Sequence, residues 1–388
     1  MRAGISLDPS RAGPRYTRFA AAQVDDKIKA VMRLSSKSAI YDASAVESLD
    51  TLYAMAGLVR NPRGLSSPGS SRARSGGVAP EELRPARPAV RRAANGVEWL
   101  PIPGWDLPWL CCGFSTRKGG LSRAYCPEAA PGELNLGFTA ADSRPTVLGN
   151  RRLLAEAITG NAATPVLALK QFHSNLVVDA GKADADRATP RRADGQITCD
   201  PDLLLAVQTA DCIPVLVADR RQRIVAAFHA GWRGTVKRIV ETGVGRMRLL
   251  YGSRPGDLMA AIGPGAAACC YAVGEEVLAE FESQFHYARE LFHEVFASDP
   301  IKTRYPMLFL TQRAPGHSPI GPSLHADLVE ANRRQLLDSG LMPSAIQVVG
   351  GCTQCQGDLF FSHRASQGHA GRMMAVIGMR GAGKRRSR

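Results

Sequence analysis

The sequence predicts an α+β (mixed α/β) fold, and three observations support this class. From Trp99 onward, short apolar runs alternate with Gly- and Pro-containing turns, which is typical of buried strands joined by turns. Two longer stretches carry apolar residues at helical spacing,. Strands and helices do not alternate with the steady period of a doubly wound parallel sheet, so we expect a mixed arrangement without internal repeats.

The predicted elements follow in chain order, each for a local reason. Three consecutive apolar runs predict buried strands over 203–207, 213–217 and 224–228,. Apolar residues three or four apart predict helices over 235–251 and 327–337,. A last apolar run predicts a strand over 373–377.

Composition divides the chain into three parts. Residues 1–98 form a basic, low-complexity extension that we expect to be disordered, because it buries too little apolar area to offset its ordering entropy,. One helix over 38–58 fits its apolar spacing. Residues 99–379 form the predicted folded domain, and residues 380–388 are a basic tail. The Arg-rich start faintly resembles an organelle transit peptide, and an over-extended start is the alternative.

The net charge of +14 lies mainly at the two ends of the chain. The predicted extension holds 16 Lys and Arg against nine Asp and Glu, and the tail adds five basic residues. We therefore expect solvated ends with no more than weak contact to nucleic acid. No apolar run is long enough to cross a membrane,. Nine cysteines without framework spacing favour a reduced compartment and a cytoplasmic location,.

Three residues at predicted strand ends are candidate metal ligands. His173, Cys212 and His229 each lie beside an apolar run, where a rigid scaffold presents functional groups to solvent. Thiolate and imidazole are preferred Zn²⁺ ligands, and three protein ligands leave one position open for water or substrate. No spacing rule ties these residues together, so three ordinary packed or surface side chains remain the alternative.

Many ordered motifs resemble the YfiH family of laccase-domain proteins, also labelled multicopper polyphenol oxidase, purine nucleoside phosphorylase and peptidoglycan editing factor. The matching segments span about 270 residues: 113–122, 134–137, 150–152, 171–173, 209–215, 229–234, 262–264, 270–277, 327–336, 352–353, 360–364 and 371–372.

The resemblance implies a fold, a metal site and an activity. It implies one domain with sheets packed between helices and a zinc ion bound by His173, Cys212 and His229. It also implies phosphorolysis of adenosine, inosine, guanosine and methylthioadenosine, with purine nucleoside and phosphate as the partners, and deamination of adenosine. The older family label adds copper-dependent oxidation of phenols, with copper binding in vitro.

The chemistry suggests roles for four further residues. Asp211 is a candidate proton carrier because it adjoins ligand Cys212, and a hydrogen-bond anchor for the turn is the alternative,. Arg117, Arg233 and Arg364 are candidate phosphate ligands because the guanidinium fork matches phosphate geometry, and structural ion pairs are the alternative,. The start of the helix after Gly231 is expected to add an anion site.

Two other function classes stay open. The resemblance also implies hydrolytic editing of a peptidoglycan precursor. In this reaction, Cys212 is the candidate nucleophile and His229 the candidate base,. A partner-binding module without catalysis is the third hypothesis. True laccase activity is disfavoured, because the chain has only eight histidines and no His-X-His pair,.

The sequence departs from the family pattern at a few positions. Ser174 stands where glycine is usual, and Ala272 replaces a glutamate. His363 and Ala365 replace a tyrosine and an arginine near the end of the domain. The changes at Ala272 and Ala365 put substrate preference in doubt more than the presence of chemistry. Residues 286–325 form an expected insertion that carries four histidines.

Two motifs stand outside the family reading. Cys352 and Cys355 form a Cys-X-X-Cys pair with His363 and His369 downstream, which indicates a second zinc site or a redox pair,. No second Cys-X-X-Cys exists to complete it. Residues 378–384 have P-loop spacing, but Arg385 stands where Ser or Thr must bind Mg²⁺, so this segment is expected to be tail,.

Overall fold

A computed structural model describes residues 78–185, 187, 189–296 and 322–381. The strands are β1 (Arg91–Arg92), β2 (Glu98–Leu100), β3 (Leu110–Ser115), β4 (Lys118–Ser122), β5 (Val166–Ala168), β6 (Val177–Asp179), β7 (Gly195–Thr198), β8 (Leu204–Thr209), β9 (Ile213–Asp219), β10 (Ile224–Ala230), β11 (Leu258–Ile262), β12 (Phe292–Val295), β13 (Ser323–Ala326), β14 (Ile346–Val348) and β15 (Met373–Met379). The helices are α3 (Arg144–Thr159), α4 (Lys182–Ala185), α5 (Trp232–Val236), α6 (Ile239–Tyr251), α7 (Glu275–Gln284) and α10 (Leu328–Asp338), with 3₁₀ turns η1 (Pro255–Asp257), η2 (Ala288–Leu291) and η3 (Pro343–Ala345).

Two six-stranded sheets form the centre of the described domain. One sheet has the order β1-β2-β3-β15-β8-β5, and the other has the order β14-β11-β9-β10-β7-β6. Most neighbouring strands are antiparallel, and β5–β8, β6–β7 and β11–β14 pair in parallel. Strands β12 and β13 form a separate antiparallel pair.

Alternating side chains place the two sheets face to face. Along β10, Val225 and Ala227 pack in one core cluster with Val207 and Ala375 of the other sheet. Ala226 and Phe228, which alternate with them, pack on the opposite face, against the helices. This period of two is expected for strands that are buried on both faces.

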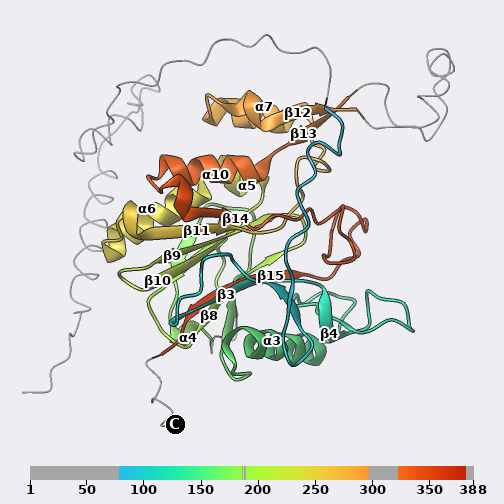
Figure 1. Cartoon of the computed structure of the whole chain (residues 1–388), viewed down its shortest axis with the longest axis vertical. Helices are drawn as coiled ribbons and strands as arrows, with labels where there is room; N and C mark the ends of the chain where they lie inside the picture. The colour runs from blue at the N-terminus through green and yellow to red at the C-terminus, as the bar shows by residue number, and fades with distance from the viewer. Residues whose placement is uncertain (1–77, 186, 188, 297–321, 382–388) are drawn as a thin grey trace, which may run out of the picture. The chain divides into compact units, whose positions relative to one another are not determined.

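Helices cover the outer face of each sheet (Figure 1). Helices α6 and α10 pack against β9, β10 and β11, while α3 packs against β8 and β15. The result is a helix–sheet–sheet–helix arrangement. It confirms the predicted α+β class and the single domain with sheets packed between helices.

The helix ends follow local capping chemistry. Ser143 caps α3 by accepting a hydrogen bond from the Thr146 N–H, and Gly160 ends that helix in the left-handed conformation,. The Asp327 carboxylate caps α10 through the Glu330 N–H. The strands predicted over 203–207, 213–217, 224–228 and 373–377 are confirmed, as is the helix over 327–337 apart from its capping residue.

The helix predicted over 235–251 is interrupted. The first helix, α5, begins at Trp232, before the predicted start, and ends at Val236. The second helix, α6, begins at Ile239. Arg238 lies between them with a φ of 60°, a conformation that costs a non-glycine residue about 1–2 kcal/mol,. Its guanidinium donates to Glu241 and to the Gln284 carbonyl, which offsets that cost. Apolar periodicity continues across the break, so spacing alone did not reveal it.

The predicted domain boundary at residue 98 is too late. Residues 78–98 are described, and β1 pairs with β2, which joins the sheet of β3. Val78 also forms a parallel bridge with Val295. The alternating Arg, Ala and Pro residues of this segment hid its edge strand. The predicted helix over 38–58 and most of the basic tail lie outside the described residues.

Within the described part of the chain, no helix combines the length and apolar character needed to cross a membrane.

Candidate metal centre

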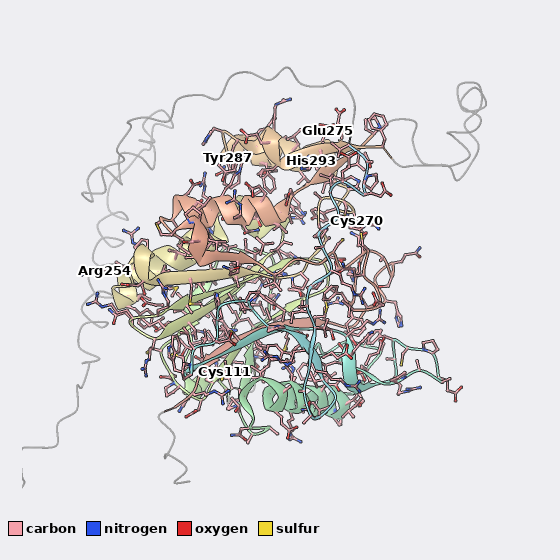
Figure 2. The ribbon with its side chains drawn as sticks, viewed as in Figure 1. Cys111, Arg254, Cys270, Glu275, Tyr287 and His293 are labelled. Carbon is pink, nitrogen blue, oxygen red and sulfur yellow. The ribbon has the colours of Figure 1, made fainter. Side chains whose placement is uncertain are left out.

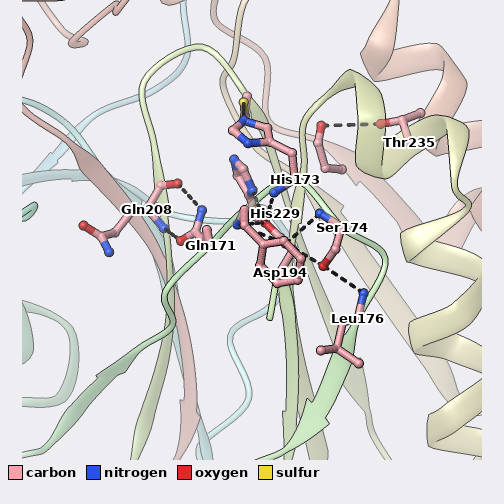
Figure 3. Close-up of polar contacts among 11 residues, drawn as sticks. Gln171, His173, Ser174, Leu176, Asp194, Gln208, His229 and Thr235 are labelled. Atoms are coloured by element: carbon pink, nitrogen blue, oxygen red, sulfur yellow. Dashed lines mark hydrogen bonds and ion pairs between the residues drawn. The ribbon is translucent and has the colours of Figure 1, made fainter. Parts of the chain in front are cut away.

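The three candidate ligands come from three separate strand ends. His173 lies in the loop after β5, Cys212 lies in the turn between β8 and β9, and His229 lies near the end of β10. Strands β9 and β10 pair so that His229 lies opposite Pro214, which places Cys212 two residues away. The antiparallel pairing thus brings Cys212 and His229 to the same end of these two central strands. The loop after β5 brings His173 beside His229 (Figure 3).

The ligand atoms are close enough to share one metal ion. The potential ligand atoms of His173, Cys212 and His229 all lie within 4.8 Å of one another. Cys212 Sγ is 3.7 Å from His173 Nε2. The two imidazole rings have centroids 5.0 Å apart at 65°. One sulfur and two nitrogen donors at these separations fit a tetrahedral zinc ion with one position left over.

Asp194 organises the site from behind. Its Oδ1 is 2.9 Å from His229 Nδ1, which leaves Nε2 of that ring to face the other ligands. The same carboxylate accepts hydrogen bonds from the backbone N–H groups of Phe172, His173 and Ser174. A buried carboxylate that orients a ligating imidazole fixes the ring and its tautomer. Asp194 therefore positions two of the three ligands.

Sequence reasoning missed Asp194. The residue is fully buried and stands directly before β7. A charged residue at the start of a buried strand needs a buried partner. An aspartate at the start of such a strand is therefore the sequence signal that could have identified it. Its partner His229 is 35 residues away in the sequence, so the pairing itself could not be seen there.

The backbone around the ligands is tight. A Cβ on Gly231 would lie 3.0 Å from Cys212 Sγ and 2.9 Å from His173 Cδ2, so glycine avoids a clash with these side chains where the chain passes from β10 into α5. His173 and Asp211 have φ values of 61° and 96°. Left-handed non-glycine residues are held in place by their surroundings and are common at functional sites. Hydrogen bonds to Asp194 supply that restraint for His173.

The charges in the site stabilise a thiolate. Burial raises the pKa of Cys212, but the His229 charge and hydrogen bonds from His173 and His229 outweigh it and lower that pKa to about 6,. Burial lowers the pKa of His229, but Cys212 and Asp194 raise it to about 9. Burial opposes ionisation of Asp194 as well, yet hydrogen bonds from His229 and Ser174 hold its pKa well below the usual range. A thiolate is the form that binds a metal or attacks a substrate.

Asp211 anchors a neighbouring segment. Its Oδ1 accepts a hydrogen bond of 2.6 Å from Thr353 Oγ1, and its Oδ2 accepts one of 2.8 Å from the Arg364 backbone N–H. Both oxygens are therefore engaged in holding the 353–364 segment against the Cys212 turn. This arrangement matches the anchor alternative of the sequence analysis.

A cavity of about 420 Å³ adjoins the metal centre. Arg364 in its wall connects the two, because its backbone N–H donates to Asp211, the residue before Cys212. Burial and the negative charge of Cys212 raise the pKa of Tyr271, also in the wall, to about 12. The cavity receives side chains from the segments that follow His229, Cys270 and His363. Its lining residues are Trp232, Arg233, Tyr271, Ala272, Val273, Gly274, Glu276, Val277 and Arg364.

The three candidate arginines have different surroundings. Arg233 and Arg364 line the cavity. The guanidinium carbon of Arg233 lies 4.2 Å from the centre of the Trp232 ring, and that of Arg364 lies 4.7 Å from the centre of the Tyr271 ring. Among the described residues, the Arg233 guanidinium has no hydrogen-bonded or ionic partner, while Arg364 donates to the Ala272 carbonyl. Two of the three arginines are therefore available to a ligand in the cavity.

Arg117 lies outside the cavity lining and is held by protein groups. Its Nε is 2.7 Å from Glu133 Oε1, and its Nη1 donates to the Gly357 carbonyl at 2.6 Å. These contacts match the structural ion pair that was the alternative for this residue. The expected anion site after Gly231 also lacks support, because α5 is only five residues long.

The chain is similar to known proteins over most of its length. A family model described as multi-copper polyphenol oxidoreductase laccase matches residues 111–380. Purine nucleoside phosphorylase YlmD of Bacillus subtilis is 34% identical over 279 residues, which cover 70% of this chain and 90% of that protein.

Solved structures agree with this relationship. The crystal structure of YlmD from Geobacillus stearothermophilus aligns with a TM-score of 0.60 at 30% identity, covering 76% of this chain and 100% of that one. The crystal structure of Bacillus licheniformis hypothetical protein YfiH aligns with a TM-score of 0.61 at 28% identity, covering 75% of this chain and 99% of that one. With the matched family model and the shared fold, the chain belongs to the YfiH family of laccase-domain proteins.

Proposed function

We propose that the chain is a zinc-dependent purine nucleoside phosphorylase that also deaminates adenosine. Adenosine, inosine, guanosine and methylthioadenosine are the proposed nucleosides. The observation that carries this proposal is an open three-ligand set, His173, Cys212 and His229, beside a cavity that contains two arginines. The Bacillus subtilis relative bears the name purine nucleoside phosphorylase, which supports the substrate class.

The donor set supports zinc as the metal. Two imidazoles and one thiolate are ligands that zinc prefers, and Asp194 gives His229 the hydrogen-bonded carboxylate that such ligands commonly have,. When bound, a zinc ion with an open position supplies a Lewis acid that polarises an oxygen and lowers the pKa of water.

Residues of the cavity have roles that follow from their charge. Arg233 and Arg364 hold phosphate next to C1′ of the ribose, where a phosphate oxygen forms a bond as the bond from C1′ to the purine breaks,. Trp232 and Tyr271 offer aromatic faces to the purine,. In deamination, water adds at C6 of adenine and ammonia leaves with a proton. Asp211, which precedes Cys212 in the chain, is the proposed proton carrier. In that role it must exchange its hydrogen bond from Thr353 for one with the substrate.

A hydrolase that uses Cys212 as a nucleophile is the second candidate. The observation that favours it is the Cys212–His229–Asp194 series, in which the thiol pKa is lowered to about 6 and the imidazole is oriented by a carboxylate,. Editing of a peptidoglycan precursor is the reaction proposed for this arrangement. It needs no metal, so metal content separates the two candidates.

Copper-dependent polyphenol oxidation has less support. A laccase needs a second, histidine-rich copper cluster in addition to a single copper centre. In the described residues, His173, Cys212 and His229 are the only grouping of potential ligands that includes histidine. Copper bound there would be one isolated ion.

Matched variants test the proposed function. Wild-type protein, Cys212→Ala and the exposed-cysteine control Cys199→Ala are assayed for ribose 1-phosphate release from inosine and for adenosine deamination. Metal content is measured on the same samples. We expect both activities in the wild type and the control. In Cys212→Ala, we expect both activities to fall more than about 100-fold and one metal ion per chain to be lost. Full phosphorolysis by Cys212→Ala would contradict the proposal.

A further inference from the structure

A second group of potential ligands lies outside the candidate metal centre. Cys269, Cys270, Cys352 and Cys355 have all four Sγ atoms within 4.8 Å of one another. They come from two segments more than 80 residues apart, one after β11 and one after β14. Cys269 and Cys352 are buried, and the other two are partly exposed. The Cys-X-X-Cys motif is visible in the sequence, but the two cysteines that lie beside it in the fold could not be identified there.

The spacing of the sulfur atoms fits one tetrahedral ion. Cys355 Sγ lies 3.5 Å from Cys269 Sγ and 3.2 Å from Cys270 Sγ. Four sulfurs at about 2.3 Å from a shared zinc ion would lie about 3.8 Å apart, close to these values. A disulfide requires about 2.05 Å. An iron–sulfur cluster places its own inorganic core between the thiolates and holds them farther apart.

Backbone geometry prepares the cluster for metal binding. Gly265 and Cys352 form a parallel bridge, which brings the two segments together at the ligands. Beside this bridge, the Thr353 N–H donates to the Gly265 carbonyl at 3.0 Å, which fixes the backbone next to Cys352.

The surroundings of the cluster are apolar. The two buried cysteines pack with Ala267, and Leu83 packs on the same group. No cavity-lining arginine and no histidine is part of the group. A site with four protein thiolates and no free position is typical of structural zinc.

We propose that Cys269, Cys270, Cys352 and Cys355 bind a structural zinc ion that clamps together two segments beside the cavity. The first segment continues directly into Tyr271 and Ala272 of the cavity wall. The second contains Thr353, which anchors Asp211, and leads to Arg364. The proposed ion thus fixes the part of the cavity wall that contains Tyr271, Ala272 and Arg364. This inference does not depend on which reaction the cavity supports.

Zinc stoichiometry tests the site on the full chain, purified untagged under reducing conditions without chelator. We expect two zinc ions per wild-type chain, one in Cys355→Ser, and two again in Cys355→His, because imidazole replaces the lost ligand. The control Cys199→Ser should retain two. One zinc in the wild type that disappears in Cys212→Ala would overturn the proposal.

Cobalt in the Cys212→Ala chain tests the same site without altering it. Refilling this variant with Co²⁺ should give one ion per chain, with intense thiolate-to-cobalt charge-transfer absorption and the visible bands of a tetrahedral site. Absence of bound cobalt would contradict the proposal. Alkylation and mass analysis of the freshly purified wild type should find no disulfide among the four cysteines, and a Cys270–Cys355 disulfide would also overturn it.

Discussion

The two groups of sulfur and nitrogen donors in this domain differ in ways that separate reactivity from structural support. His173, Cys212 and His229 offer three potential ligands of two kinds, backed by a buried carboxylate. The four-cysteine cluster provides four ligands of one kind, packed in apolar surroundings. An open position permits chemistry, whereas a filled shell contributes to stability.

The electrostatics of the two groups differ in the same sense. At the open site, the counter-charge to Cys212 comes from His229, which Asp194 orients. In the cluster, all four groups are cysteine thiols, and neither an imidazole nor a carboxylate is among them. The first arrangement contains groups that can exchange protons with a substrate. The second contains no such imidazole–carboxylate pair.

The largest expected effect is a loss of stability from Cys352→Ser. Removing a ligand of the cluster should lower the free energy of unfolding by about 3 kcal/mol or more, because metal binding contributes directly to folding. Thermal unfolding in the presence of zinc measures this change. Open-site zinc should remain bound.

Cys111→Ser is the matched control for Cys352→Ser. Cys111 is also buried, but it lies in β3, well away from Cys270 in Figure 2. Its substitution should cost less, and the cost should not depend on zinc. Equal, zinc-independent costs for the two variants would remove the distinction between cluster and core.

The next largest effect is expected from Asp194→Asn. Because Asp194 orients His229 and holds the His173 backbone, its loss should weaken metal binding or activity about 10- to 100-fold. Competition with a metal-sensitive dye measures the affinity.

Asp219→Asn provides the comparison for Asp194→Asn. Asp219 is equally buried and accepts backbone N–H hydrogen bonds from Arg221 and Gln222 at the other end of β9. Its substitution should leave the metal affinity unchanged. The same loss in both variants would assign the effect to general destabilisation.

A smaller effect is expected from Arg233→Ala. This guanidinium lines the cavity, so its removal should raise the KM for phosphate about tenfold, the cost of one charge-assisted contact, with little change in Tm. Steady-state phosphorolysis at varied phosphate measures the change. Arg117→Ala should do the reverse, lowering Tm through loss of the Glu133 ion pair while preserving the KM. A higher KM in Arg117→Ala alone would reverse the assignment.

The smallest expected effect is that of Ser174→Gly, which restores the residue usual in the family. The Ser174 hydroxyl donates to Asp194 at 2.7 Å, and its loss should cost about 1 kcal/mol of stability. The remaining N–H donors to Asp194 should keep the loss of metal affinity well below that of Asp194→Asn. Melting curves and zinc titration of the two variants check this ranking.

Sequence patterns predicted the parts of the molecule that depend on local periodicity. The buried strands β8, β9, β10 and β15 lie where apolar runs predicted them. The break at Arg238 escaped detection because its left-handed backbone is stabilised by tertiary contacts to Glu241 and Gln284. Local signals cannot report such contacts.

The site shows the same division. His173, Cys212 and His229 were found through resemblance, and the structure brings them together. Asp194 was missed because its role depends on a hydrogen bond to His229, which is 35 residues away in the sequence. Likewise, Cys352 and Cys355 lacked visible partners until the Gly265–Cys352 bridge joined two distant segments.

The most direct test of the account is the relation between bound zinc and inosine turnover in wild-type protein. Controlled chelation should remove the ion held by His173, Cys212 and His229 before the ion held by the four cysteines, because three protein ligands leave one position open to a chelator,. Phosphorolysis should disappear as the first equivalent of zinc leaves, with one zinc still bound, and return when one equivalent is restored. Unchanged turnover after that first zinc has left would contradict the metal mechanism and favour Cys212 as a nucleophile.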